Sequence, residues 1–209
     1  MRARPISRAA LVEELADRVG GFPRDRWVRV AVDGAPPAGP GALADELVAP
    51  LRLRGREVLR VSADDFLRPA SLRLEYGRTD PDAFHDDWLD VGALLREVLE
   101  PLGPGGSGRV LARLWDSRVD RAYREPYRVL PRGGVLVLDG TLLLGRGLPV
   151  ELSVHLWLSE GALARGTQEE ERWRLPAYRR YERETRPQEA ADVVVRADHP
   201  ERPAVLFTG

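Results

Sequence analysis

The sequence contains no cysteine, no lysine and no asparagine, and its only isoleucine and only methionine are Ile6 and Met1. Without cysteine the chain has no disulfide, no thiolate nucleophile and no cysteine-ligated zinc. Without lysine it has neither a Schiff-base amine nor a lysine that binds phosphate. All 32 basic residues are arginine, so every cationic role in the chain must be filled by arginine.

The 33 acidic side chains nearly balance the basic ones, which gives the 209-residue chain a formal net charge of −1. A balance this close to zero argues against bulk electrostatic capture of nucleic acid. No apolar run approaches the roughly 18 residues of a membrane span, and no apolar stretch of a secretory signal follows the first arginines. We therefore expect a cytoplasmic globular protein with one domain over residues 1–209 and with neither a nucleic-acid nor a membrane partner.

Buried strands alternate with helical patterns along the chain. The expected strands are residues 27–32, 57–62, 135–138, 152–158 and 193–195, and the expected helices are residues 8–19, 41–54 and 91–99. This alternation predicts an α/β fold with a parallel sheet of about five strands and helices on both faces.

Acidic residues or glycine turns follow three of the expected strands, at Asp33-Gly34, Asp64 and Asp139-Gly140. Ligands of such folds bind beyond the carboxyl ends of the strands, where these carboxylates should lie. An alternative is that Asp64, Asp65 and Asp139 only cap turns. Both interpretations are open at this point.

The segment between the first of these strands and the next helix has the frame of a phosphate-binding P-loop, G-x-x-x-x-G-K-[ST]. Gly34 and Gly39 keep the glycine spacing, but Pro40 stands at the lysine position and Gly41 at the hydroxyl position. The lysine would neutralise the β- and γ-phosphates, and the hydroxyl would hold magnesium. A simple turn between strand and helix is the alternative to a phosphate cradle.

Prolines also change the backbone of this loop. Pro36, Pro37 and Pro40 have no N–H, so up to three donors of a phosphate-binding nest are missing. Pro40 suits the first turn of a helix, so the helix itself should form. The sequence therefore predicts that ATP binding at this loop is weak or lost.

Several segments in order resemble the uridine kinase family of P-loop kinases, particularly its actinobacterial-type members. Residues 62–69, Ser-Ala-Asp-Asp-Phe-Leu-Arg-Pro, are similar to the family's strand-end D-x-F-x-R-P segment. The other similar segments are residues 30–34, 44–47, 76–78, 81–87, 101–106, 138–144, 175–181, 191–194 and 198–200, together with Arg73 and Pro187. The resemblance covers most of the chain and implies a three-layer P-loop fold with a small helical lid near residues 165–187.

The resemblance implies transfer of the γ-phosphoryl group of ATP to a hydroxyl of a nucleoside or similar small metabolite, with Mg²⁺. Asp64 matches the catalytic base, and Asp64 and Asp139 match the carboxylates near the metal. The candidate lid arginines are Arg172, Arg174 and Arg179. The candidate nucleotide-binding residues are Gly34, Gly39, Gly41 and Ala42. The candidate acceptor-binding residues are Asp65, Phe66, Arg68, Tyr76, Phe84, His85 and Asp87.

Three functions stay open. The first is a uridine-kinase-like phosphotransferase, and the second is a catalytically inactive pseudokinase that binds a nucleoside-like ligand or a protein partner. The third is a kinase for another hydroxylated metabolite with altered phosphate handling. Structural roles are the alternatives for single sites: Phe84 and Trp88 as core, His85 in a solvated loop, and residues 169–186 as a solvated helix face.

Overall fold

The centre of the molecule is a seven-stranded sheet with the strand order β1-β11-β10-β9-β2-β8-β3. The computed structural model describes residues 3–199 and 202–207, so residues 1–2, 200–201 and 208–209 of the predicted domain lie outside the described part. The strands of this sheet are β1 (Arg4–Pro5), β2 (Val28–Gly34), β3 (Val58–Ser62), β8 (Val135–Gly140), β9 (Leu152–Trp157), β10 (Val193–Arg196) and β11 (Ala204–Phe207).

The predicted parallel sheet is confirmed, with two further strands at one edge. Strands β3, β8, β2, β9 and β10 run parallel to one another. β11 and β1 then add in antiparallel orientation. The sequence did not predict these edge strands because segments as short as Arg4–Pro5 and Ala204–Phe207 carry too few residues for a periodic pattern.

The inner strands β2 and β8 are buried at every position and are mostly aliphatic, as is typical of a sheet covered on both faces. Their register brings the strand ends together, because Val32 and Ser62 both lie opposite Asp139. The acidic strand ends therefore gather at one edge of the sheet, as the alternating pattern predicts.

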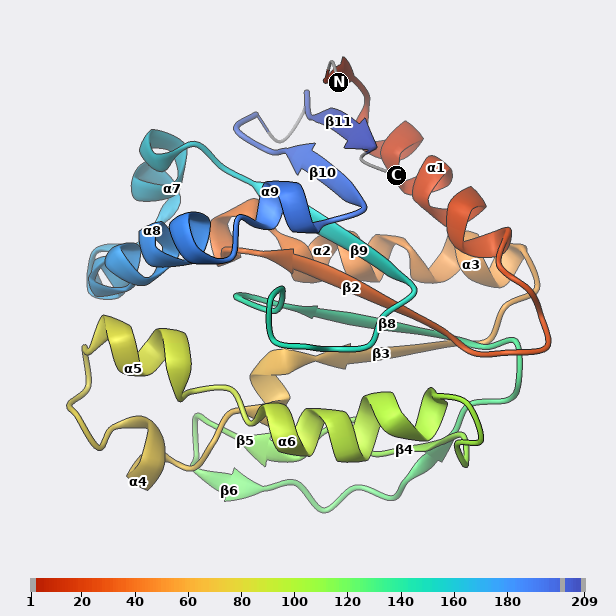
Figure 1. Cartoon of the computed structure of the whole chain (residues 1–209), viewed down its shortest axis with the longest axis horizontal. Helices are drawn as coiled ribbons and strands as arrows, with labels where there is room; N and C mark the ends of the chain where they lie inside the picture. The colour runs from red at the N-terminus through yellow and green to blue at the C-terminus, as the bar shows by residue number, and fades with distance from the viewer. Residues whose placement is uncertain (1–2, 200–201, 208–209) are drawn as a thin grey trace.

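One face of the sheet is covered by α1 (Arg8–Gly20), α2 (Pro40–Glu46) and α3 (Val48–Leu53) (Figure 1). Ser7 caps α1, as its hydroxyl accepts a 3.2 Å hydrogen bond from the Ala10 N–H. Leu11, Leu15 and Leu43 are fully buried in the core on this side. The helix expected over residues 41–54 begins one residue earlier, at Pro40, and is divided at Leu47 into α2 and α3.

The other face is covered by α6 (Val91–Leu94), which continues as a π-helical segment to Leu99, and by two short ribbons. The ribbons are β4 (Arg109–Val110) with β7 (Arg128–Val129), and β5 (Trp115–Asp116) with β6 (Arg121–Ala122). The remaining helices are α4 (Ala70–Arg73), α5 (Pro81–Asp86), α7 (Glu160–Gly166), α8 (Leu175–Glu184) and α9 (Pro187–Ala190). Across residues 3–199 and 202–207, the helices are too short or too polar to cross a bilayer.

The segment predicted as a lid forms a 3₁₀ stretch, Glu169–Arg174, followed by α8. α8 packs beside α5 at the carboxyl-end edge of the parallel strands (Figure 1). Phe84 of α5 meets Tyr178 of α8 edge to face, with ring centroids 5.8 Å apart. This aromatic packing makes the two helices one wall above the strand ends.

Candidate functional site

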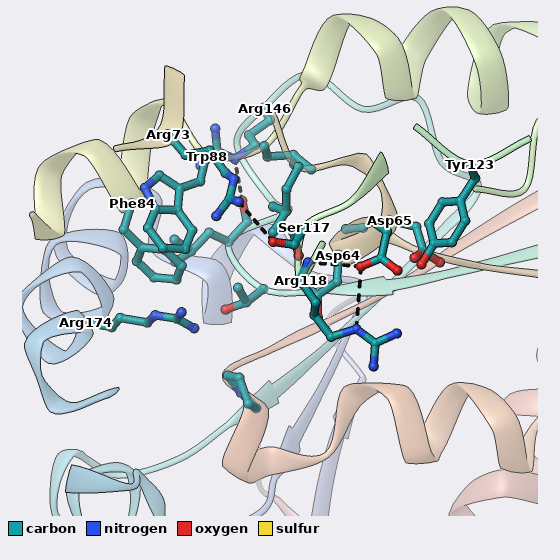
Figure 2. Close-up of a pocket in the computed structure, with 17 residues that line it drawn as sticks. Asp64, Asp65, Arg73, Phe84, Trp88, Ser117, Arg118, Tyr123, Arg146 and Arg174 are labelled. Atoms are coloured by element: carbon teal, nitrogen blue, oxygen red, sulfur yellow. Dashed lines mark hydrogen bonds and ion pairs between the residues drawn. The ribbon is translucent and has the colours of Figure 1, made fainter. Parts of the chain in front are cut away.

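A cavity of about 460 Å³ lies beyond the carboxyl ends of β3 and β8. Figure 2 shows Phe84, Trp88 and Arg174 on one side of it and Asp65 and Tyr123 on the other. The aromatic side is supplied by α5, by the segment after it and by the 3₁₀ stretch before α8. The volume falls within the range of about 300–1,000 Å³ that is usual for small-molecule sites.

The carboxylates stand on the 3₁₀ turn Ala63–Phe66, which follows β3 directly. Burial raises the pKa of Asp64, the charge of Asp139 raises it further, and the nearby Arg174 opposes both effects. Burial likewise raises the pKa of Asp65, against the charge of Arg113. Two carboxyl groups with raised pKa values in a cavity are suited to accepting protons or hydrogen bonds from ligand hydroxyls.

The opposite side combines aromatic rings with guanidinium groups. Phe84 and Trp88 meet edge to face at 5.2 Å between centroids. The Arg174 guanidinium carbon lies 4.8 Å from the Phe84 centroid and 5.2 Å from that of Trp88. Arg73 lies over the same Trp88 ring at 5.1 Å. The rings form an aromatic wall of the cavity that a flat ligand can contact. The guanidinium groups of Arg73 and Arg174 place positive charge along this wall.

The loop that follows β2 folds into a tight turn. The Ala38 N–H donates to the carbonyl of Ala35 at 2.8 Å, and the Gly39 N–H donates to the carbonyl of Pro36 at 3.0 Å. Gly39 has a φ of 73°, which a glycine adopts without strain, and α2 starts at the next residue. Two of the N–H groups that a phosphate nest would use are therefore bonded within the loop.

Arg60 of β3 contacts Asp139, the acidic residue at the end of β8. Its guanidinium donates 2.8 Å hydrogen bonds to the carboxylates of Asp139 and Asp45. A Cβ atom at position 41 would lie only 3.1 Å from the other Asp139 oxygen. Asp139 is thus held between an arginine and the Gly41 backbone.

These contacts do not fit the magnesium ion and triphosphate that the family resemblance implies. A metal at Asp139 would lie beside the positive charge of Arg60, which bonds one oxygen of that carboxylate, and Gly41 supplies no hydroxyl to hold it. Among residues 3–199 and 202–207, no group of three or more histidine, aspartate or glutamate side chains could hold a metal ion. No chemical step is therefore assigned here to either group.

The structure brings four of the predicted site residues into one cavity: Asp64, Asp65, Phe84 and Arg174. Asp139 lies beneath it, close enough to Asp64 to shift its pKa. Phe66 is fully buried in the core below the turn. The predicted nucleotide-binding residues belong to the tight loop and its two flanks: Gly34 ends β2, Gly39 ends the turn, and Gly41 and Ala42 lie in the first turn of α2. Their catalytic and binding roles stay predictions.

The other predicted residues do not line this cavity. Tyr76 is 68% exposed. Arg172 pairs with Glu169 at 3.2 Å on the surface. Arg179 pairs with Glu160 beside a second cavity of about 590 Å³. The remaining three are Arg68 and Asp87, 3.8 Å apart, and His85, whose Nδ1 lies 2.6 Å from Asp86.

The sequence assigns no binding role to several residues that line the cavity, namely Arg73, Trp88, Ser117, Arg118, Tyr123 and Arg146, although Arg73 is part of the family resemblance. Trp88 is seven-percent exposed, consistent with its interpretation as core, yet it also faces the ligand space. Ser117, Arg118 and Tyr123 lie in or next to the ribbon formed by β5 and β6, and the sequence carries no motif for this ribbon. The sequence marks Asp33 only as a strand end, whereas in the structure it accepts hydrogen bonds from the Tyr181 hydroxyl and the Leu143 N–H.

Solved structures with this fold include kinases. A possible uridine kinase from Bacillus stearothermophilus is 18% identical, with a TM-score of 0.70 over 88% of this chain and 96% of that one. A protein from Silicibacter sp. TM1040 named as a fructose transport system kinase is 23% identical, with a TM-score of 0.60 over 89% and 95%. The YGR205w protein is 11% identical, with a TM-score of 0.62 over 91% and 93%.

No family model matches the chain, and a search of curated proteins found no match. The chain therefore shares its fold with P-loop kinases, and its substrate and activity must be argued from the site.

Proposed function

We propose that the chain binds a small hydroxylated, nucleoside-like ligand in the cavity at Asp64 and does not transfer a phosphoryl group from ATP. One contrast carries this proposal: the ligand cavity keeps paired carboxylates and an aromatic wall, whereas the loop that would hold a triphosphate is bonded to itself. The chain is in this view a pseudokinase with a degenerate P-loop, derived from a uridine-kinase-like ancestor.

Ligand binding is supported by the chemistry of the cavity. Asp64 and Asp65 are acceptors for sugar hydroxyls, and the pKa of each is raised by burial. Phe84 and Trp88 supply the flat apolar surface that a base or sugar ring would contact. A few convergent polar groups in a largely preformed apolar cavity are typical of small-molecule sites.

The loss of transfer is supported by what phosphoryl transfer requires. Its catalysis is positioning and charge neutralisation, with little covalent chemistry from the protein. Pro40 and Gly41 supply neither the lysine charge nor the magnesium-binding hydroxyl. Each such loss costs on the order of several kcal/mol of transition-state stabilisation, so turnover should fall by many orders of magnitude.

A second candidate is a kinase for another hydroxylated metabolite, with altered phosphate handling. It is favoured by the arginines that line the cavity, which are Arg73, Arg118, Arg146 and Arg174. Guanidinium groups stabilise transferring phosphoryl charge in many kinases and GTPases. This candidate requires phosphoryl transfer by the protein with its native loop, whereas a pseudokinase transfers no phosphoryl group.

Calorimetric titration with a panel of nucleosides and sugars, beside a phosphoryl-transfer assay with Mg-ATP, separates the two. We expect a ligand to bind the native protein, binding to be lost in Asp64→Ala, and no transfer to occur. Asp25→Ala, at an exposed position away from the cavity, is the matched control. Native turnover that disappears in Asp64→Ala would establish the second candidate. Micromolar binding of Mg-ATP that depends on Gly39 would refute the loss of ATP binding.

A further inference from the structure

We infer that the ligand of this cavity carries an anionic group, a carboxylate or a phosphate ester, in addition to its hydroxyls. This inference rests on the proposed function and names the ligand class. It comes from the way hydrogen-bond donors and acceptors divide the cavity, and above all from the surroundings of Arg73.

Arg73 is a buried cation without an anionic partner. It ends α4 and is only 7% exposed. Its Nε donates to the carbonyl of Arg68 at 2.6 Å, and a terminal nitrogen donates to the carbonyl of Ser117 at 3.4 Å. Within residues 3–199 and 202–207, no carboxylate lies at ion-pair distance from its guanidinium. A buried charge that lacks a partner is costly, so a ligand anion would be favoured beside it.

The electrostatic surroundings agree with this geometry. Burial lowers the pKa of Arg73, and the positive charge of Arg174 lowers it further. Asp120 opposes both effects only in part. One Asp120 oxygen is already bonded to the Ala70 N–H at 2.8 Å and to the Trp115 indole at 3.0 Å. The negative charge that would balance Arg73 is therefore left for a ligand to supply.

Arg56 shows what a buried arginine with a purely structural role looks like in the same chain. It is 2% exposed and, within the described part of the chain, pairs with no carboxylate. Its terminal nitrogens donate to four backbone carbonyls, those of Gly20, Phe22, Pro23 and Gly133. Arg56 does not line the cavity, whereas Arg73 has half as many acceptors and lines it.

Trp88 adds a further unsatisfied donor on the same side. Its indole Nε1 is buried and has no hydrogen-bond partner among the residues that the structure describes. Arg73 and Arg174 lie 5.1 and 5.2 Å from the centroids of Trp88, so two guanidinium groups flank this indole. Arg174 has Glu171 at 2.6 Å as its partner, and Arg73 has none. Charge-assisted donors of this kind bind carboxylate and phosphate oxygens.

The acceptors lie on the other side of the cavity. Figure 2 shows Asp65 and Tyr123 away from Trp88 and Arg174, with Asp64 between the two sides. A ligand that places hydroxyls at Asp64 and Asp65 would thus direct an acidic group toward Arg73. A neutral nucleoside would leave the buried charge of Arg73 without a counter-ion, which costs affinity.

Calorimetric titration with four matched probes tests this inference: ribose, ribonate, ribose 5-phosphate and uridine. We expect ribonate or ribose 5-phosphate to bind at least about tenfold more tightly than ribose. The comparison of the two acids identifies the anion, and inorganic phosphate alone measures binding of the charge without the hydroxyls. In Arg73→Gln the preference for the anion should fall to within about twofold. Arg78→Gln removes the same charge from an exposed position nearby and should leave the preference unchanged.

If uridine or ribose binds as tightly as the acids, or if the preference survives in folded Arg73→Gln, the inference is wrong and the proposed function stands. If none of the four probes binds, the inference and the proposed function both fail. Should Arg73→Gln not fold, Arg73→Lys keeps the charge and Arg73→Met removes it while keeping an apolar stem. We then expect the preference to persist in the first variant and to decrease in the second.

Discussion

The hydroxyl of Tyr181, on α8, donates a 2.9 Å hydrogen bond to the fully buried carboxylate of Asp33 at the end of β2. The same carboxylate accepts from the Leu143 N–H at 2.9 Å and lies 2.7 Å from Nδ1 of His155. The Leu144 N–H in turn donates to the Tyr181 oxygen at 2.9 Å. These bonds tie the predicted lid helix to the central strands of the sheet.

Tyr181→Phe should therefore destabilise the fold. The change keeps the ring but removes a donor to Asp33 and the acceptor of the Leu144 N–H. Leaving buried partners unsatisfied costs about 1–3 kcal/mol, which urea unfolding would measure as a decrease in the free energy of unfolding. Tyr76→Phe, at an exposed site, is the control and should change stability little. Equal stability of the two variants would contradict the assigned role of Tyr181.

Stability should also depend on pH through His155. Burial by itself lowers the pKa of His155, but the hydrogen bond to Asp33 and the negative charges of Asp33 and of Glu182, which lies 3.6 Å from Nε2, outweigh it and raise the pKa to about 9. A folded pKa above the unfolded value of about 6.5 stabilises the fold fully below pH 6.5, and this contribution is lost as pH rises toward 9. We expect the free energy of unfolding to fall by up to about 3 kcal/mol across that window.

His155→Gln provides the control for this pH dependence. The variant should be less stable at neutral pH, and its stability should decline less between pH 6.5 and 9. His85→Gln, on α5, should retain the decline of the native protein. A native protein whose stability is constant from pH 6.5 to 9 would show that His155 is not charged in the folded state.

The sequence predicted the sheet and the gathering of acidic strand ends at one edge, because both depend on local patterns. Runs of buried aliphatic residues marked the inner strands, and Asp64 and Asp139 followed two of them directly. Strand register then brought these residues to one edge. Pro40 also predicted correctly that a helix would begin at the loop.

The sequence could not predict contacts between segments far apart in the chain. Arg60 looks like an exposed residue of an edge strand, but it bonds to Asp139, which lies 79 positions later. Arg73 belongs to the family resemblance but received no role from it, and Trp88 carries no motif. Both line the cavity because of the way α4 and the segment after α5 face it. Tyr76 matched the resemblance in sequence and yet lies on the surface.

Asp64→Asn should separate stability from ligand binding. Burial and the charge of Asp139 raise the pKa of Asp64, so the folded state disfavours its charged form. An acid with a raised folded pKa destabilises the fold at any pH above its unfolded value of about 3.9. The amide should therefore raise the melting temperature at pH 7, and the gain should vanish near pH 3.

The same substitution should weaken ligand binding, because an amide nitrogen replaces one of the acceptor oxygens. Stabilisation with reduced affinity is expected of a functional group held in an unfavourable environment. Asp25→Asn should change neither quantity. A less stable Asp64→Asn protein with unchanged affinity would mean that Asp64 only caps the turn after β3.

The pair of Arg60 and Gly41 predicts how metal binding could be regained. Arg60→Ala removes the hydrogen-bonded cation from Asp139, whose side chain is only 11% exposed, and should cost about 1.5–3 kcal/mol. Gly41→Ser alone would place a Cβ atom 3.1 Å from the Asp139 carboxylate that Arg60 holds in place. The double variant frees the carboxylate and supplies the hydroxyl. Mg²⁺ should therefore raise its melting temperature and leave the native protein unaffected.

Arg8→Ala combined with Gly41→Ser is the control for this gain, because Arg8 also pairs with a carboxylate on α2, that of Glu46 at 2.8 Å. This variant loses an arginine but leaves Arg60 on Asp139, so Mg²⁺ should not stabilise it. Arg60→Lys with Gly41→Ser should behave in the same way, since lysine keeps a positive charge beside the carboxylate. Stabilisation of the native protein by Mg²⁺ would show that the ion displaces Arg60 from Asp139. It would contradict the conclusion that Arg60 and Gly41 prevent metal binding there.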